Sequence, residues 1–333
     1  MRTGDMVVSK KKIGLVGYYG WGNYGDEYFR IIMRDQVFSD SEVTDVTGYP
    51  SKYTPKESRE MVDDKECIII GGGDLVIPYF FSEAYWRDEY LRRPVYIHGV
   101  GVPRWGGYDE HVVLKMRKFF QHPNVKRVSA RDIESRDWIE KHLQPRVPVV
   151  AEPDIVCSQL FEEQTPVPGR FGIVLRHQPN PPHPEHLQML ITKAEERGLN
   201  PVFIILGTDN TMRDDFLHMV GLELGNTDIL IRNSPEKLTE ALLSCEKVAS
   251  MKFHGCVVAM SCNRPTLSLS AADKFKSFYG MCNRSEWISP FKSPHFESAL
   301  NSVLDAEKFE FPEQLRQDAS MGLANLRQAV LSS

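Results

Sequence analysis

The densest group of candidate catalytic residues lies in MKFHGCVVAMSCNRPTLSLSAADKFKSF, residues 251–278. Lys252 and His254 follow one short apolar run, and Lys274 and Lys276 follow the next. If the two runs are adjacent parallel strands, the loops after them meet at one edge of a sheet. They then gather several cations around an imidazole, the side chain that titrates near neutral pH. Such a pocket suits a small, highly charged anion.

Two arginines are further candidates: Arg176 could join this cluster from a third strand, and Arg131 is expected on the edge of the sheet formed by the first half of the chain. Arg176 ends the apolar run GIVLRH, and Arg131 follows another run in SARDIESRDWI. An arginine at a strand end can hold a carboxylate or phosphate through two parallel hydrogen bonds. Simpler interpretations stay open, because Asp132 can cap a helix and pair with Arg131, His254 can be a satisfied residue at a helix start, and each lysine can be a solvated surface charge.

A second candidate site is the glycine-rich corner within KKIGLVGYYGWGNYGDEYFRIIMRDQVF, residues 11–38, which does not match the GxGxxG dinucleotide fingerprint. An apolar strand leads into the corner, and an amphipathic helix leaves it near residues 23–26. Free amides at a helix start favour an anion or a hydrogen-bonding ligand. Asp26 or Glu27 can instead satisfy these amides, leaving the corner to hold a sugar hydroxyl.

Aromatic residues and further glycines accompany this corner. Tyr18, Tyr19 and Trp21 suit stacking on a sugar or a base, although they can equally belong to the core. The sequence GGGD, residues 71–74, directly follows an apolar run. Three glycines let the backbone approach a ligand closely, and they also permit simple close packing of a strand and a helix.

The segments that must position these residues share one pattern: a short β-branched run is followed by glycines or charged residues. Such runs in the first half lie at residues 13–16, 67–70, 95–98 and 125–129, and in the second half at 172–177, 201–207, 228–233, 247–251 and 264–270. Helix-length segments separate them, which predicts parallel sheets covered by helices on both faces. The sequence EEQTPVPGR, residues 162–170, has no periodicity and is the candidate linker.

We therefore predict an α/β protein with two Rossmann-like domains facing each other across a cleft. The predicted domains are residues 1–165 and 166–310, followed by a C-terminal helix over 311–333 whose docking site the sequence does not reveal. His98 and the candidate residues at strand ends are expected on the edge of the first sheet that faces the cleft.

Composition narrows the function classes. The 333 residues carry a net charge of -5 without a basic stripe, which argues against a nucleic-acid partner. Six cysteines without metal-ligand spacing favour buried, reduced thiols and a cytoplasmic location. No apolar run approaches the roughly 20 residues of a membrane span, so we expect at most peripheral membrane contact. Hydrolase elbows, zincin helices and Walker loops are absent from the sequence, and no visible residue set requires a metal.

The order of these motifs resembles the polysaccharide pyruvyl transferase family. That family shows a GxxGxxNxGDE-like corner, a GGG loop, a strand followed by Arg-Asp, and an Arg/Lys-x-His segment with a lysine downstream. The matching segments here are residues 17–27, 71–74, 131–132 and 252–254, followed by Lys274, so that the resemblance runs from about residue 11 to 280. This sequence departs from the family in having Lys252 where arginine is more frequent, and Ala271-Ala272 where an aromatic often precedes the lysine.

The resemblance implies a fold similar to that of GT-B glycosyltransferases and transfer of pyruvate from phosphoenolpyruvate onto two hydroxyls of one sugar as a cyclic ketal. No cofactor is expected beyond phosphoenolpyruvate as co-substrate. We assign His254 and Asp26 as catalytic residues. The expected donor-binding residues are Arg131, Arg176, Lys252 and Lys274, and the expected acceptor-binding residues are Asn23, Glu27, Gly72, Gly73 and Asp74.

Several alternatives remain at this stage. The same architecture could serve a GT-B-like glycosyltransferase that uses a nucleotide sugar, or a glycan-binding protein without catalytic activity. The acceptor sugar could be carried on a lipid or on a nucleotide, and a lipid carrier would place the protein at the inner face of the membrane.

Overall fold

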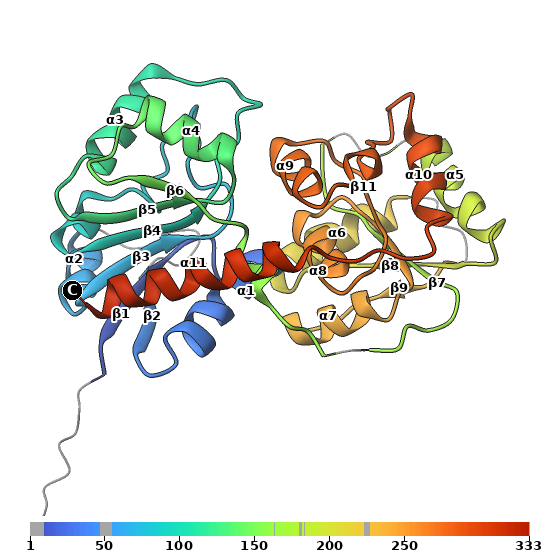
Figure 1. The fold of residues 1–333 in the computed structure, drawn as a ribbon, viewed down its shortest axis with the longest axis horizontal. Coiled ribbons are helices and arrows are strands. Elements are labelled where there is room, and N and C mark those ends of the chain that lie inside the picture. The colour runs from blue at the N-terminus through green and yellow to red at the C-terminus, as the bar shows by residue number, and fades with distance from the viewer. Residues whose placement is uncertain are drawn as a thin grey trace, which may run out of the picture.

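The computed structural model describes residues 10–46, 55–162, 164–179, 182, 184–222 and 227–332. In this part of the chain, two parallel β-sheets form the centres of two α/β domains that lie side by side (Figure 1). The first sheet has the strand order β2-β1-β3-β4-β5-β6, and the second has the order β11-β10-β7-β8-β9. The predicted α/β class is confirmed, and the predicted boundary at residues 165/166 falls between the two sheets.

The first domain is built from alternating strands and helices. Its strands are β1 (Lys12–Val16), β2 (Glu42–Asp45), β3 (Cys67–Gly71), β4 (Val95–Val100), β5 (Val125–Ala130) and β6 (Val149–Ala151). Its helical segments are α1 (Tyr24–Ile31), the π-helical η1 (Ile32–Val37), α2 (Pro55–Asp63), η2 (Asp88–Arg92), α3 (Glu110–Phe120), α4 (Ile133–His142) and η3 (Ile155–Ser158).

The second domain repeats this alternation. Its strands are β7 (Arg170–Val174), β8 (Asn200–Ile204), β9 (Ile229–Leu230), β10 (Lys247–Ser250) and β11 (Thr266–Ser268). Its helical segments are α5 (Pro184–Glu195), α6 (Asp209–Val220), α7 (Pro235–Leu243), α8 (Phe253–Ser261), α9 (Asp273–Met281), η4 (Ser285–Trp287) and α10 (Phe296–Leu304). The final helix of the chain is α11 (Glu313–Leu331).

Local sequence explains most of these elements. Strand β3 reads CIIIG and is buried throughout, as expected for a parallel strand with helices on both faces of its sheet. Helix α7 begins directly after Ser234, whose side chain accepts a hydrogen bond from the backbone N–H of Lys237 and so caps the helix. The edge strands β2 and β6 were not predicted: β2 has no buried residue and β6 contains three residues.

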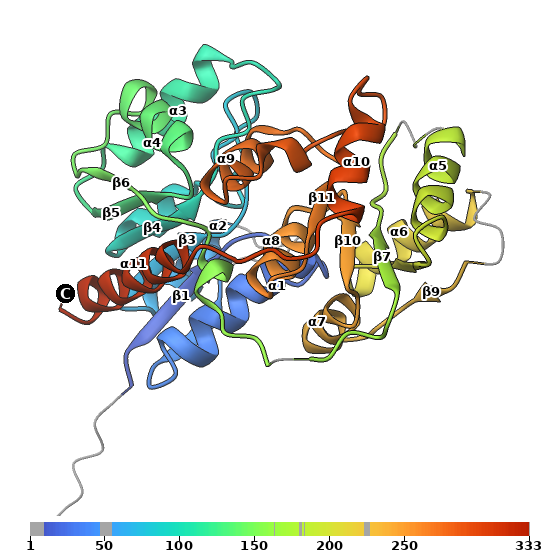
Figure 2. The same cartoon turned by 45° about the vertical axis from the view of Figure 1, so that its right-hand side comes forward.

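Helix α11 returns from the second domain to pack on the first (Figures 1 and 2). It contacts η1, η3 and β4. Lys11 Nζ donates to the carbonyl of Val330 at 2.6 Å, and Arg327 Nη2 pairs with Asp40 Oδ2 at 2.6 Å. The docking site that the sequence did not reveal is therefore the face of the first domain formed by these elements.

One hydrophobic cluster runs through both domains. It includes Ile13 and Ile69 of the first sheet, Phe171 of the second, Tyr24 of α1 and Leu326 of α11. The opposite face of the first sheet packs a separate cluster. Because the larger cluster is continuous, α1 and α11 hold the two domains together by apolar burial. None of the described helices combines the length and the apolar composition that a membrane span requires.

We expect Leu326→Ala to destabilise the protein more than a substitution on the exposed face of the same helix. Leu326 is completely buried, so the cavity should lower the free energy of unfolding by about 2–5 kcal/mol. Met321 is 58% exposed, and Met321→Ala should change it by less than about 0.5 kcal/mol. Urea denaturation followed by circular dichroism measures both values; equal effects would contradict this docking of α11.

Candidate active site between the two sheets

A cavity of about 370 Å³ opens at the carboxyl ends of the strands, where the two domains meet. Strand β10 lies between β7 and β11, so the loops after these three strands meet at one wall. The opposite wall comes from α1 and the loops after β3 and β5. Predicted site residues that line the cavity are Asn23, Asp26, Gly73, Asp74, Arg131, Arg176, Lys252, His254 and Lys274. Glu27 and Gly72 are not among the lining residues, and Lys276 is exposed on α9 outside the cavity.

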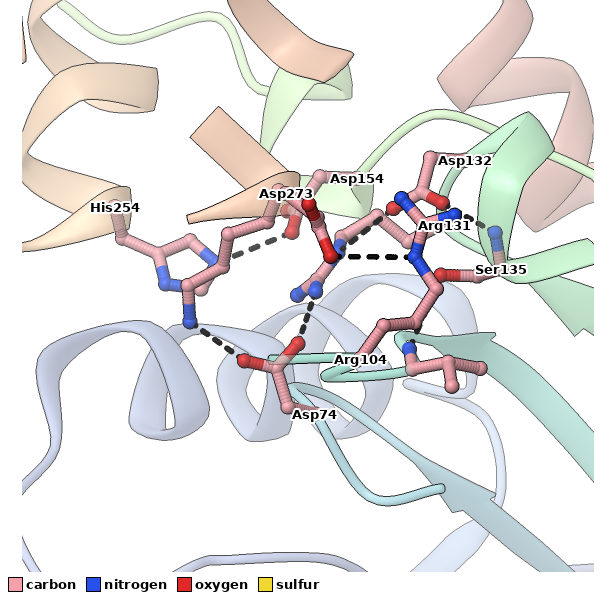
Figure 3. A network of polar contacts seen from close by, with 10 residues as sticks. Asp74, Arg104, Arg131, Asp132, Ser135, Asp154, His254 and Asp273 are labelled. Carbon is pink, nitrogen blue, oxygen red and sulfur yellow. Dashed lines mark hydrogen bonds and ion pairs between the residues drawn. The ribbon is translucent and has the colours of Figure 1, made fainter. Parts of the chain in front are cut away.

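Asp74 lies between two cations contributed by different domains (Figure 3). It accepts from Arg131 Nη2 of the first domain through Oδ1, and from Lys274 Nζ of the second domain at 2.8 Å through Oδ2. Burial alone would raise the pKa of Asp74, but Lys274 and Arg131 hold it well below its usual value. Asp74 therefore bridges two predicted donor-binding residues as an ionised carboxylate.

Arg131 is fixed by close packing as well as by charge. Its side chain is 4% exposed, and a Cβ built on Gly101 would lie 2.1 Å from Arg131 Nη2, so only glycine fits beneath the guanidinium. The ring of Phe253 lies 5.3 Å from the guanidinium carbon and 5.7 Å from Lys274 Nζ, which adds cation–π attraction to both cations.

Asp132 has the capping role that the sequence left open. Its Oδ1 accepts from the backbone N–H of Ser135 at 2.7 Å, at the start of α4. It pairs with Arg131 only through a longer contact of 3.7 Å to Nε. The capping function and the inward-pointing arginine therefore coexist.

His254 is oriented by a carboxylate that sequence reasoning missed. Its Nε2 lies 3.2 Å from Asp154 Oδ2, while Asp154 Oδ1 accepts from the backbone N–H of Val156 at 3.0 Å. Burial opposes the charge of Asp154, but His254 outweighs it and lowers the pKa of that carboxyl. Because an ionised Asp154 is acceptor-only, a neutral His254 keeps its proton on Nε2 and leaves Nδ1 as the acceptor.

The other side of the His254 ring faces the start of α1. A Cβ built on Gly25 would lie 1.7 Å from His254 Nδ1, so the imidazole packs directly on the helix backbone. Asn23 caps this helix through Gly25 N–H, and it forms an isolated β-bridge with Gly207 of the second domain. The glycine corner is thus part of the seam between the domains as well as of the cavity wall.

The neighbouring acids Asp26 and Glu27 have different surroundings. Asp26 lines the cavity and is 7% exposed; burial raises its pKa to about 7, although His254 and Lys274 partly offset the shift. Glu27 accepts from the backbone N–H groups of Gly20 at 2.6 Å and Gly22 at 3.3 Å. Glu27 therefore satisfies amides of the corner that precede the helix, while Asn23 rather than either acid caps the helix start.

The remaining predicted residues form the periphery of the cavity. Lys252 Nζ pairs with Asp215 and donates to the carbonyl of Leu206 at 2.8 Å. Burial lowers the pKa of Lys252, and Asp215 opposes that shift. Arg176 is exposed at the rim, and Gly72 packs on the ring of Phe29 with a φ of +86°.

Of the three aromatics at the glycine corner, only Tyr18 lines the cavity. Tyr19 is buried and donates to the carbonyl of Gly71 at 2.6 Å, and Trp21 accepts through its carbonyl from Thr211. His98 lies within the first sheet at 1% exposure, with its Nδ1 3.1 Å from Ser129 Oγ, and burial lowers its pKa to about 4. The expectation that His98 lies on the cleft edge was therefore wrong.

The missed residues Asp154 and Asp215 had weak signals in the sequence. Asp154 lies in AEPDIV, residues 151–156, directly after the β-branched run VPVV, residues 147–150. An acid that closely follows such a run is the feature that could have identified it. Asp215 lies in the middle of α6 among other charges, and nothing in that pattern distinguishes it. Among the described residues, no three His, Cys, Asp or Glu side chains lie together as a metal site requires.

Together, fold and cavity define a two-domain α/β protein with a charged site between its sheets. The chain belongs to the polysaccharide pyruvyl transferase family, whose sequence model matches residues 23–273, and it is an enzyme of that type. The match covers most of the cavity residues and ends one residue before Lys274. No curated protein sequence is significantly similar to this chain.

Solved structures show the same fold at low identity. UDP-N-acetylglucosamine 2-epimerase from Rickettsia bellii superimposes with a TM-score of 0.59 at 13% identity, covering 97% of this chain and 96% of that chain. The same enzyme from Methanocaldococcus jannaschii gives 0.56 at 9% identity, with coverages of 95% and 99%. HepE from Anabaena, in complex with UDP-glucose, gives 0.52 at 13% identity, with coverages of 95% and 94%. The GT-B-like arrangement of two Rossmann-like domains is thereby confirmed.

We expect Asp26→Asn to change how stability depends on pH. Because the folded pKa of about 7 exceeds the unfolded value of 3.8, folded Asp26 keeps a proton that the unfolded chain loses. The wild-type free energy of unfolding should therefore fall, relative to that of Asp26→Asn, as pH rises from about 4 to about 7, by on the order of a few kcal/mol. Urea denaturation of both proteins across this range measures the difference, because the contributions of groups that titrate alike in the two proteins cancel. Parallel curves of unfolding free energy against pH would show that Asp26 is not buried as described.

Proposed function

We propose that this enzyme transfers the pyruvyl group of phosphoenolpyruvate onto two hydroxyls of one sugar as a cyclic ketal, in the biosynthesis of a polysaccharide or cell-surface glycan. The observation that carries this proposal is the placement of Arg131 and Lys274, from different domains, beside two proton-exchanging groups, His254 and Asp26, in one cavity. The volume of about 370 Å³ lies within the range of small-ligand pockets, about 300–1,000 Å³. Phosphoenolpyruvate carries a carboxylate and a phosphate, the two groups that such cations bind best.

Asp74 acts as the resident partner of the donor-binding cations. A donor anion that binds Arg131 and Lys274 replaces the oxygens of Asp74 and releases this carboxylate toward the acceptor. Arg176 at the rim offers a further positive charge. Lys252 is committed to Asp215, so it contributes its charge to the wall rather than a free ammonium group. The same positive field stabilises the departing phosphate.

The proposed chemistry requires one proton donor and an acceptor for each of two hydroxyl protons. As an imidazolium, His254 delivers a proton to the methylene carbon of phosphoenolpyruvate, which becomes a methyl group and leaves the neighbouring carbon electrophilic. A sugar hydroxyl bonds to that carbon and gives its proton to Asp26. The carbon–oxygen bond to phosphate then breaks, and the leaving phosphate takes the proton from Asp26. The second hydroxyl closes the ketal and gives its proton to His254, which restores both groups. Asp26 suits this part, since a base with a pKa near working pH is the most effective.

The first test is phosphate release from phosphoenolpyruvate with a panel of lipid-linked and nucleotide-linked sugars. We expect acceptor-dependent release, with His254→Ala lowering kcat by about 10²-fold or more, the contribution of a general acid or base. Lys274→Ala should mainly raise the KM for phosphoenolpyruvate, by about tenfold or more. Lys276→Ala, on the same helix but outside the cavity, is the control and should leave both constants unchanged.

Turnover of a nucleotide sugar without phosphate release from phosphoenolpyruvate would overturn the proposal. It would favour a glycosyltransferase that uses the same cavity for a diphosphate. Tight sugar binding without turnover of either donor, unchanged by His254→Ala, would instead indicate a glycan-binding protein. Circular dichroism of each variant separates loss of activity from loss of fold.

Asp154→Asn tests the orientation of the proposed acid. An asparagine can present its amide N–H to His254 Nε2, which favours the wrong tautomer, so kcat should fall by about 10²-fold while the KM for phosphoenolpyruvate changes little. The pH–kcat profile should shift as well, because the imidazolium loses its anionic partner. A variant with normal kcat and an unchanged profile would restrict Asp154 to its hydrogen bond with Val156.

A further inference from the structure

Two loops of the first domain carry exposed aromatic side chains next to the cavity. They follow the neighbouring strands β3 and β4, so they lie on the same sheet edge as Gly73 and Asp74. Phe80 is 59% exposed in the first loop, and Trp105 and Tyr108 are 74% and 63% exposed in the second. We call these three residues the aromatic platform.

The platform stands out in the described part of the chain. There, the only other aromatic side chain with comparable solvent contact is Phe216 on α6, at 37% exposure. An aromatic group in water contributes nothing to the core, so exposed rings on two adjoining loops indicate a binding surface.

The two loops are held rigidly against each other. The backbone N–H of Asp109 donates to the carbonyl of Pro78 at 2.9 Å, and the rings of Tyr79 and Trp105 lie 5.4 Å apart. A Cβ built on Gly106 would lie 2.3 Å from the Tyr79 ring, so the second loop rests directly on that ring. The platform is therefore preorganised, which lowers the entropy cost of binding.

The platform is continuous with the cavity. Ile77 lines the cavity, and the platform residue Phe80 follows three positions later in the same loop. Three residues span at most about 11 Å, the length of roughly two sugar rings. On the other side, Arg104 Nε reaches Asp273 Oδ2 at 3.2 Å, next to Lys274 of the cavity wall. A saccharide chain that leaves the cavity past Ile77 would therefore reach the platform next.

We propose that the aromatic platform binds sugar residues adjacent to the one that receives the pyruvyl group. The new element is the site itself, a surface outside the cavity that holds neighbouring sugars of the acceptor chain; it rests on the function proposed above. Aromatic faces stack on the C–H faces of sugar rings, while the polar edges of Trp and Tyr meet hydroxyls. Exposed Glu110 suits hydroxyl groups and, together with Asp109, which caps α3 through Oδ1, disfavours an anionic membrane surface.

The test compares the binding of saccharides of different length without any donor. The probes are the monosaccharides and linear tetrasaccharides of glucose, galactose, mannose and N-acetylglucosamine, titrated by calorimetry. For at least one sugar, the tetrasaccharide should bind at least about tenfold tighter than the monosaccharide, and Trp105→Ala should remove about three- to tenfold of that gain. Phe216→Ala is the matched control and should leave both affinities unchanged.

The proposal is overturned if saccharide affinity does not depend on chain length, or if Trp105→Ala leaves the gain in affinity of the tetrasaccharide intact. It is also overturned by loss of binding to phosphatidylglycerol vesicles in Trp105→Ala without any effect on saccharides, which would make the surface a membrane contact. Failure of the proposed reaction would be seen separately. If the protein releases no phosphate from phosphoenolpyruvate but still shows a length-dependent gain in affinity that requires Trp105, the platform is supported and pyruvyl transfer is not.

Discussion

The site depends on the contact between the His254 imidazole and the backbone of Gly25. Helix α1 belongs to the first domain, but its first turn is packed against the second, so the imidazole and the helix start meet at the seam. A side chain at Gly25 would occupy the position of the ring. The β-bridge of Asn23 with Gly207 and the hydrogen bond of 2.7 Å between Tyr24 and Thr239 fix the same turn. The geometry of the cavity and the contact between the two domains thus depend on the same packing.

Buried charge is the second feature that sets the site apart. Asp74 is balanced by two cations and Lys252 by Asp215, while Asp154 lies 3.2 Å from the His254 ring across the domain boundary. Burying ion pairs seldom stabilises a fold, because desolvation costs about as much as the attraction returns. Among the described residues Asp26 forms no ion pair, and burial raises its pKa. Such an arrangement is costly for folding and useful for chemistry, which is typical of active sites.

Helix α11 extends the same logic to the whole molecule. It leaves the second domain and buries Leu326 against the first, so the two domains share one hydrophobic cluster. Two interdomain ion pairs, Asp74 with Lys274 and Arg104 with Asp273, lie at the cavity mouth instead. The apolar contacts join the domains away from the cavity. The polar contacts lie where a charged ligand could compete for the same cations.

The sequence by itself determined the elements that depend on local pattern. Apolar runs identified β3, β4, β5 and the strands of the second sheet, because fully buried parallel strands are almost continuously apolar. The amphipathic pattern after the glycine corner located the start of α1, because a helical face repeats within four residues. Most candidate residues of the cavity could be named for the same reason, because parallel strands present their following loops at one edge.

Only the tertiary structure decided which side chains meet. Asp154 comes to His254 across 100 positions of sequence, and Lys274 comes to Asp74 across 200. The adjacent acids Asp26 and Glu27 carry the same functional group but have different surroundings. Successive side chains on a helix point about 100° apart, and only one of these two directions leads into the cavity. His98, expected at the cleft, is instead buried within its sheet. Pairing, burial and the resulting pKa shifts arise from distances between distant segments, and no local pattern encodes those distances.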